Sequence, residues 1–184
     1  VASYVPDSAP VAFRGGNSRH TRDIRYAHDG PSRYVTGPYP EEEFWDDLLR
    51  VTHGMTNEEL ARLTIRESAD IADWGQANGV RWQLPLRGTL HLARTNVFML
   101  GGGKAMMNAY YATAEKLGVE IYYQTEVREL EMRDGQFVSA VCVNDGDLRT
   151  IDAKVLVVAS GGLEANIPWL KEYWGDAAAN CIIR

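Results

Sequence analysis

The chain has 184 residues, of which 45% are hydrophobic and 24% charged, and its formal net charge is −6. This size and composition are typical of a soluble globular protein with one or two domains. The acidic balance argues against nucleic acid and anionic membranes as general partners. No apolar run is long enough to cross a bilayer, and the two distant cysteines have no metal-ligand spacing, so we expect no metal site and a cytoplasmic setting.

The first residues offer two candidate ligand contacts. Ser3-Tyr4-Val5 is typical of a strand end, and Asp7 follows it, where an acidic residue can bind ribose hydroxyls or simply form a turn. Arg14-Gly15-Gly16-Asn17-Ser18 tolerates left-handed backbone, so its amides can converge on an anion. The alternative for this second segment is a plain surface turn.

Arginines are concentrated in the same part of the chain. Their guanidinium groups suit bidentate binding of carboxylate or phosphate, which predicts a local anion site, with Arg19 and Arg22 as candidate substrate contacts. The alternative is a solvated loop whose arginines pair with nearby acids. The residues concerned are Arg14, Arg19, Arg22, Arg25 and Arg33 on one side and Glu41, Glu42, Glu43, Asp46 and Asp47 on the other.

Two helices are predicted next. Glu41–Glu43 place acid in the first turn of a helix that ends before Gly54, with Phe44, Trp45, Leu48, Leu49 and Thr52 on its apolar face. Thr56-Asn57-Glu58-Glu59 is a capping box for a second helix, which we expect to run to Asn78-Gly79 with inner positions Leu60, Leu63, Ile71 and Trp74. Residues 80–100 show no clear period and predict loop or short strands. Within them His91 and Arg94 are candidate substrate contacts or ordinary structural residues.

Gly101-Gly102-Gly103-Lys104 does not have the spacing of a P-loop, because Ala105 follows the lysine. The glycines predict close approach at a helix start, where free amides favour negative charge. We expect that helix to bury Met106, Ala109, Tyr110, Thr113 and Leu117, to end at Gly118, and to lead into a strand over Val119–Tyr123.

An antiparallel meander is predicted over residues 127–151. Asp134-Gly135 and Asn144-Asp145-Gly146 are favoured hairpin turns between its three strands, and Cys142 is a small packed side chain in the middle strand. Val155–Val158 then reads as a strand buried on both faces of a parallel sheet, ending in Ala159-Ser160-Gly161-Gly162. We expect the three glycine segments to surround one elongated, phosphate-bearing ligand.

In this order the segments resemble the FAD domain of the fumarate reductase and succinate dehydrogenase flavoprotein family. The resemblance rests on Arg14–Ser18, on the glycine-led helix at Gly101, on Thr125-Glu126-Val127 and on Ala159–Gly162 with Leu163. It implies an α/β fold with a Rossmann-like sheet, an inserted antiparallel meander and a helical insertion. It also implies FAD as cofactor, held by Asp7, by the 14–18 segment, by the backbone of Val127 and by Ala159, Ser160, Gly161 and Gly162.

Within that family, Gly-Gly-Asn-Ser-Arg-His-Thr-Arg, Tyr-Pro-Glu-Glu-Glu-Phe-Trp and Ala-Arg-Thr-Asn are most similar to the tricarballylate dehydrogenases. That branch oxidises a small polycarboxylate by hydride transfer to flavin and passes electrons to a membrane-associated iron–sulfur protein. Residues 1–39 and 96–184 would then be a partial FAD-binding domain, and 40–95 a helical cap near the substrate.

The sequence also departs from the family pattern. The family's GxGxxG segment would precede Val1, and its proton-transferring arginine and substrate-binding histidine would follow Arg184. We therefore expect an internal fragment, inactive alone, and assign no catalytic residue. Two alternatives stay open: another flavoprotein of the family, such as a fumarate reductase or a 3-ketosteroid dehydrogenase, and a non-catalytic interaction or structural module.

Overall fold

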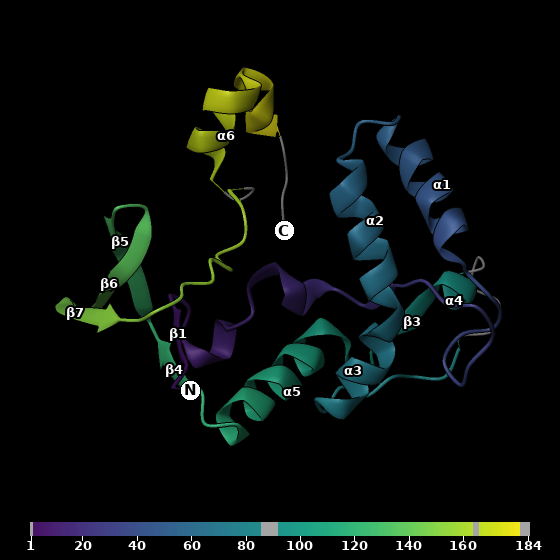
Figure 1. Ribbon diagram of the computed structural model, residues 1–184, viewed down its shortest axis with the longest axis horizontal. Coiled ribbons are helices and arrows are strands. Elements are labelled where there is room, and N and C mark those ends of the chain that lie inside the picture. The colour runs from purple at the N-terminus through teal and green to yellow at the C-terminus, as the bar shows by residue number, and fades with distance from the viewer. Residues whose placement is uncertain (1, 86–91, 164–165, 181–184) are drawn as a thin grey trace. The chain divides into compact units, whose positions relative to one another are not determined.

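The computed structural model describes residues 2–85, 92–163 and 166–180 (Figure 1). The chain forms two compact units. The described residues of 1–3 and 18–120 are called the helical unit here, and those of 4–17 and 121–184 the meander unit. Among the described residues, no helix has the length and apolarity needed to span a membrane.

A helical hairpin forms one part of the helical unit (Figure 1). Helix α1 spans Glu41–Thr52, begins with the predicted acidic turn, and ends at His53 in the left-handed conformation. Helix α2 spans Glu58–Glu67. Its N-cap is Asn57, whose side chain accepts a hydrogen bond from the Leu60 amide, so the cap lies one residue after the predicted Thr56.

The single helix predicted to run from this cap to Asn78 is wrong, because it is broken at Ser68. Helix α2 passes into a 3-10 turn, Ser68–Asp70, and then into helix α3, Ile71–Ala77. The Ser68 hydroxyl donates to the carbonyl oxygen of Ile65 at 2.6 Å and accepts the amide of Ala27 at 2.9 Å. The Ser68 side chain therefore links the point where the helix is interrupted to the backbone of Ala27.

The break also changes which side chains are buried. Leu60, Leu63 and Trp74, three of the four predicted inner positions, are exposed. Helix α2 instead packs through Ala61 and Ile65 against the apolar face of α1, where Trp45 is buried. A helical period thus existed as predicted, but tertiary packing selected a different face of it.

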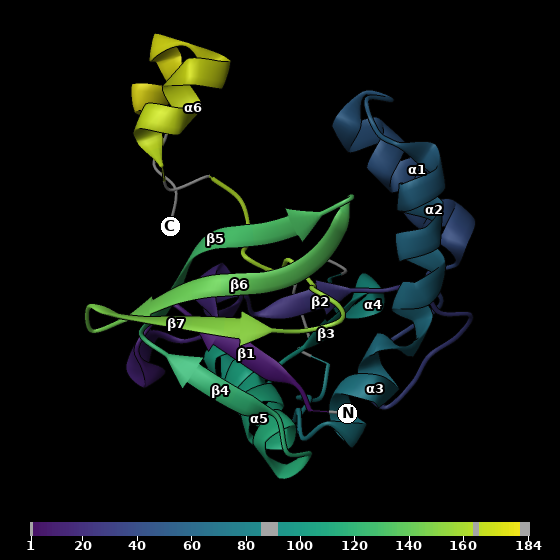
Figure 2. The ribbon, with the colours of Figure 1, turned by 60° about the vertical axis from the view of Figure 1, so that its left-hand side comes forward.

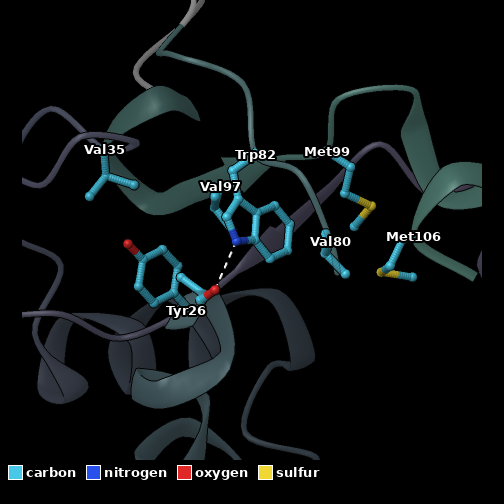
Figure 3. Close-up of a cluster of buried hydrophobic side chains, with 8 residues drawn as sticks. Tyr26, Val35, Val80, Trp82, Val97, Met99 and Met106 are labelled. Atoms are coloured by element: carbon cyan, nitrogen blue, oxygen red, sulfur yellow. Dashed lines mark hydrogen bonds between the residues drawn. The ribbon is translucent and has the colours of Figure 1, made fainter. Parts of the chain in front are cut away.

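The core of the helical unit surrounds Trp82 (Figure 3). Its indole nitrogen donates to the carbonyl oxygen of Ala72 at 2.8 Å, the dashed line in Figure 3. Strand β2, Asp23–Arg25, pairs antiparallel with β3, Asn96–Phe98, and Trp82 bridges to Met99 just beyond it. Helix α4, Leu92–Thr95, leads directly into β3.

Helix α5, Gly102–Lys116, is the predicted glycine-led helix. Met106 is buried in the Trp82 core, and Met107, Ala109 and Tyr110 pack against it. Leu117, predicted to be buried, is 76% exposed because it lies after the last helical residue, where Gly118 turns the chain with a φ of +82°.

The meander unit contains a parallel pair and an antiparallel sheet (Figure 2). Strand β1, Tyr4–Asp7, lies beside β4, Glu120–Tyr123. The amide of Glu120 donates to Ser3 and that of Gln124 to Ala9, so both strands run in the same direction. Strands β5, Thr125–Arg133, β6, Gln136–Asn144, and β7, Asp147–Asp152, form the antiparallel meander in that order.

Both predicted hairpin turns are confirmed. Asp134 and Gly135 have φ values of +50° and +76°, and Asp145 and Gly146 have +50° and +91°. Positive φ at both central residues is the geometry of the type I′ turn, which matches the twist of the flanking strands. The mixed α/β fold with an inserted antiparallel meander is therefore as predicted.

The strand predicted at Val155–Val158 is not present. This run pairs with no strand among the described residues, and Val155, Val157 and Val158 are 70–81% exposed. An extended segment becomes a strand only through cross-strand hydrogen bonds, and this run makes none with the part of the chain that the structure describes. Helix α6, Ile167–Trp174, and a 3-10 turn, Asp176–Asn180, follow.

Candidate functional site

The first glycine segment adopts the left-handed backbone that its sequence favours. Gly15 and Gly16 have φ values of +93° and +48°, and a 3-10 turn spans Gly16–His20 after a shorter one at Val11–Phe13. A β-carbon on Gly16 would meet nothing within 4 Å, so this backbone is open to an approaching group. Just before it, Arg14 donates from Nη1 to the hydroxyl of Tyr123 at 2.6 Å and lies over the same ring.

The triple glycine has a different role from the predicted one. The amide of Gly103 donates to the carbonyl oxygen of Thr21 at 2.7 Å, and the amide of Gly102 donates to Met99 at 3.2 Å. These two amides of the first turn of α5 are therefore used by the protein and are not free for an anion. The glycines instead let the helix start approach the 18–21 backbone closely.

The remaining predicted cofactor contacts lie in the meander unit. Asp7 is the last residue of β1, and its Oδ1 accepts the Ala9 amide at 2.9 Å, as in the turn interpretation. Val127 lies in β5 opposite Cys142. The run of Ala159, Ser160, Gly161 and Gly162 is exposed, and Gly161 has a φ of +75° with open space around it.

The compact units separate the two groups of predicted residues. Except for Ser18, all predicted cofactor contacts belong to the meander unit, whereas Arg19, Arg22 and Arg94 belong to the helical unit. Gly16 and Gly161 have positive φ and open space around them, and with the neighbouring guanidinium of Arg14 they fit the backbone approach and charge that a flavin dinucleotide needs. His91, the fourth substrate candidate, lies outside the described residues.

Arg94 is held by an acid rather than left free. Its two terminal nitrogens bond both carboxylate oxygens of Glu43, and Nη1 also donates to the carbonyl oxygen of Pro38. This pairing keeps the pKa of Glu43 below its ordinary value and that of Arg94 above it. Of the arginines in the 14–33 cluster, Arg25 pairs with Asp47, so salt bridging accounts for at least that member.

Sequence reasoning missed a pocket of about 520 Å³ in the helical unit. It is lined by Arg25 of β2, by Glu43, Asp47 and Arg50 of α1, and by Leu92 and Arg94 of α4. Behind it Tyr39 is fully buried and donates its hydroxyl to Asp47 at 2.8 Å. Burial and then this hydrogen bond raise the pKa of Tyr39 to about 12, while the Tyr39 hydroxyl holds the pKa of Asp47 below its ordinary value.

A second pocket, of about 200 Å³, lies in the meander unit between β4 and the sheet formed by β5, β6 and β7. Tyr122, Tyr123, Cys142, Asn144 and Arg149 line it together with Thr125. The Arg149 guanidinium lies 5.2 Å from the centre of the Tyr122 ring, and burial raises the pKa of the Cys142 thiol. The Cys142 side chain is fully buried, as its predicted packing role requires.

A family model described as "FAD binding domain" matches residues 29–183, which leaves the 14–18 segment outside the match. Among curated proteins, none matches the chain significantly.

Three solved structures illustrate the fold. The 3-ketosteroid-Δ4-(5α)-dehydrogenase from Rhodococcus jostii RHA1 is 18% identical with a TM-score of 0.74, over 92% of this chain and 42% of that one. A flavocytochrome c3 fumarate reductase in an open conformation is 22% identical with a TM-score of 0.74, over 93% of this chain and 32% of that one. The Mycobacterium smegmatis Sdh1 complex is 16% identical with a TM-score of 0.71, over 89% of this chain and 30% of that one. The chain therefore spans less than half the length of each of these structures.

Proposed function

Because the chain belongs to the FAD binding domain family, whose cofactor is FAD, we propose that it is part of a dehydrogenase that oxidises a small polycarboxylate. The observation that carries the flavin part is the family match over residues 29–183. The polycarboxylate part rests on the arginines of the helical unit and on the resemblance of the 15–22, 39–45 and 93–96 segments to tricarballylate dehydrogenases. The expected reaction converts tricarballylate to cis-aconitate.

Such an oxidation removes a hydride from one carbon and a proton from its neighbour, so that a C=C bond forms. Bound FAD would supply the hydride acceptor. In this proposal the cofactor would be held by Asp7, Arg14–Asn17, the backbone of Val127 and Ala159–Gly162 of the meander unit, and by Ser18, which belongs to the helical unit. Arg19, Arg22, Arg94 and His91 would contact the substrate, with residues 40–95 acting as a cap. The proton acceptor is assigned to no residue of this chain.

The electron acceptor and the cellular location are part of the same proposal. Electrons would pass from the reduced protein, in a cytoplasmic setting, to a membrane-associated iron–sulfur protein. A second candidate function is favoured by one observation, the similarity in fold to a 3-ketosteroid dehydrogenase. A steroid requires a large apolar cavity, whereas the larger pocket described above is lined mainly by charged side chains.

An FAD titration of the purified chain, followed by flavin fluorescence, tests the cofactor proposal directly. Gly161→Ala should weaken FAD binding, because the added β-carbon would occupy the approach to the 159–162 backbone. Gly146→Ala is the matched control, since both glycines have positive φ and open surroundings but Gly146 lies in a meander turn. Equal affinities for both variants would remove 159–162 from the site. No flavin uptake by a longer protein that also carries the expected GxGxxG segment would favour a non-catalytic module.

Substrate class is tested on a flavin-loaded longer protein that contains this chain together with the segments expected before Val1 and after Arg184, because the chain alone is expected to be inactive. Bleaching of the flavin absorbance by tricarballylate, but not by 4-androstene-3,17-dione, would support the polycarboxylate proposal. Bleaching by the steroid alone would replace it with the 3-ketosteroid alternative. Bleaching by succinate with no response to tricarballylate would assign the chain to another carboxylate-oxidising branch of the family.

A further inference from the structure

The pocket of the helical unit combines positive charge with a concave shape. Three guanidinium groups, of Arg25, Arg50 and Arg94, face it against two carboxylates, of Glu43 and Asp47. The pocket therefore carries a net positive charge within a chain whose net charge is −6. Its volume of about 520 Å³ lies within the range of small-molecule sites.

The two acids use the arginines unequally. Glu43 takes both terminal nitrogens of Arg94 in a fork-to-fork pair, so those terminal donors of Arg94 are already occupied. Asp47 instead takes only one terminal nitrogen each from Arg25 and Arg50, together with the Tyr39 hydroxyl. The Arg25 contact is long, at 3.4 Å, and the same Nη1 also donates to the Tyr39 hydroxyl at 3.2 Å.

Arg25 and Arg50 therefore have unused donors. A guanidinium carries five N–H donors in a fixed fork, and here one nitrogen of each group is engaged. Within the described parts of the chain, the other nitrogens of these two side chains have no acceptor. Their natural partner is a planar carboxylate, which accepts two parallel N–H bonds.

The wall of the pocket holds this arrangement in place. Arg25 lies over the rings of Tyr39 and Phe44, at 5.6 and 5.8 Å from their centres, so its guanidinium plane is supported by packing. Tyr39 is fully buried and fixes Asp47 through the 2.8 Å bond. Leu92 adds an apolar side chain to the lining, which suits the methylene chain of an aliphatic acid.

We infer that this pocket, formed by β2, α1 and α4, binds a carboxylate of a small aliphatic polycarboxylate through Arg25 and Arg50, with Arg94 and Glu43 as a fixed wall. The inference deepens the proposed function, since it names the residues that select the substrate class, and it rests on that proposal for the identity of the ligand. A surface ion-pair network is the competing explanation. In such a network the carboxylates would accept hydrogen bonds from all the guanidinium nitrogens. Here the described residues engage only one nitrogen each of Arg25 and Arg50.

The experiment is a calorimetric titration of the full chain, without added FAD, with tricarballylate and with its neutral triamide. Tricarballylate should bind and the triamide should not. Arg25→Gln and Arg50→Gln should each weaken binding by about tenfold or more, the size expected for a lost charge-assisted pair. Arg66→Gln is the matched control, because Arg66 pairs with Glu67 on α2 and lies outside the pocket.

Each outcome bears on the inference. Tricarballylate binding that the two pocket variants leave unchanged, or no binding at millimolar ligand, would overturn it. Arg50 is 74% exposed, so its variant should fold normally, which circular dichroism would verify. Because no flavin is added, the tricarballylate result is independent of FAD binding, and a chain that takes up FAD but not tricarballylate would refute this inference and leave the cofactor proposal standing.

Discussion

A β-carbon built on Gly103 would lie 2.1 Å from the carbonyl oxygen of Ser18. The first turn of α5 and the end of the Gly15–Ser18 segment are thus in direct backbone contact, and only glycine permits this contact. Ser18 and Gly103 therefore pack together within the helical unit, although more than eighty residues separate them in the sequence.

We expect Gly103→Ala to destabilise the chain by roughly 1 to 3 kcal/mol, the usual size of an overpacking defect. The methyl group would collide with backbone rather than with a movable side chain, so relaxation must shift residues 18–21. Gly30→Ala is the control, because it has open space and no positive φ. Urea unfolding followed by circular dichroism gives both free energies, and equal values would contradict the contact.

Gly75 provides a second test, this time against a side chain. A β-carbon there would lie 2.6 Å from Cζ2 of Trp82, whose ring is buried and hydrogen-bonded to Ala72. Gly75→Ala should therefore destabilise the protein although alanine is the better helix former. In a double-mutant cycle, Trp82→Leu should make the Gly75 substitution much less harmful, and additive free energies would exclude the clash.

The raised pKa of Tyr39 predicts that the protein loses stability at alkaline pH. That pKa is raised to about 12 by burial and by the bond to Asp47, so the folded state favours the neutral phenol. This contribution is fully present below about pH 10, the unfolded value, and is lost as the pH rises towards 12. The wild-type free energy of unfolding should fall by up to about 3 kcal/mol across this window. The fall should be smaller in Tyr39→Phe, and parallel curves would refute the assignment.

The lowered pKa of Asp47 predicts that the protein loses stability at acidic pH. The Tyr39 hydroxyl, followed by the charges of Arg50 and Arg25, holds the pKa of Asp47 below its ordinary value. The stabilisation is present above the unfolded pKa, near 4, and disappears as the pH falls through the folded pKa. Asp47→Asn should flatten the loss of stability below about pH 4. Asp46→Asn, one position away on the same helix, is the control and should retain the wild-type slope.

Local chemistry made much of the fold predictable. Asp134-Gly135 and Asp145-Gly146 determine their turns within two residues, so their geometry follows directly from the sequence. The glycine-led helix and the acidic start of α1 are similarly local. The helix over 57–78 was wrong because Ser68 bonds to Ala27, a partner that is distant in the sequence.

The candidate site was harder to predict for the same physical reason. The pocket at Arg25, Asp47 and Arg94 combines three segments that only the fold brings together, and the motif that begins at Tyr39 did not indicate that this side chain lies behind it. Pairing with the following acids, one of the two interpretations of the arginine-rich segment, is confirmed for Arg25, but the composition did not indicate which arginine would keep unused donors. The cofactor residues named from the sequence stay predictions until FAD binding is measured.

The exposed run at Val155–Val158 has a practical consequence for anyone who handles this protein. An uncharged, β-branched window whose backbone is unpaired is the typical starting point of intermolecular aggregation. We expect light scattering of concentrated solutions to rise with time and protein concentration. Val157→Lys, a gatekeeper charge at a position that is 81% exposed, should suppress that rise without lowering the melting temperature. The segment that looks most like a core strand in the sequence would then set the shelf life of the sample.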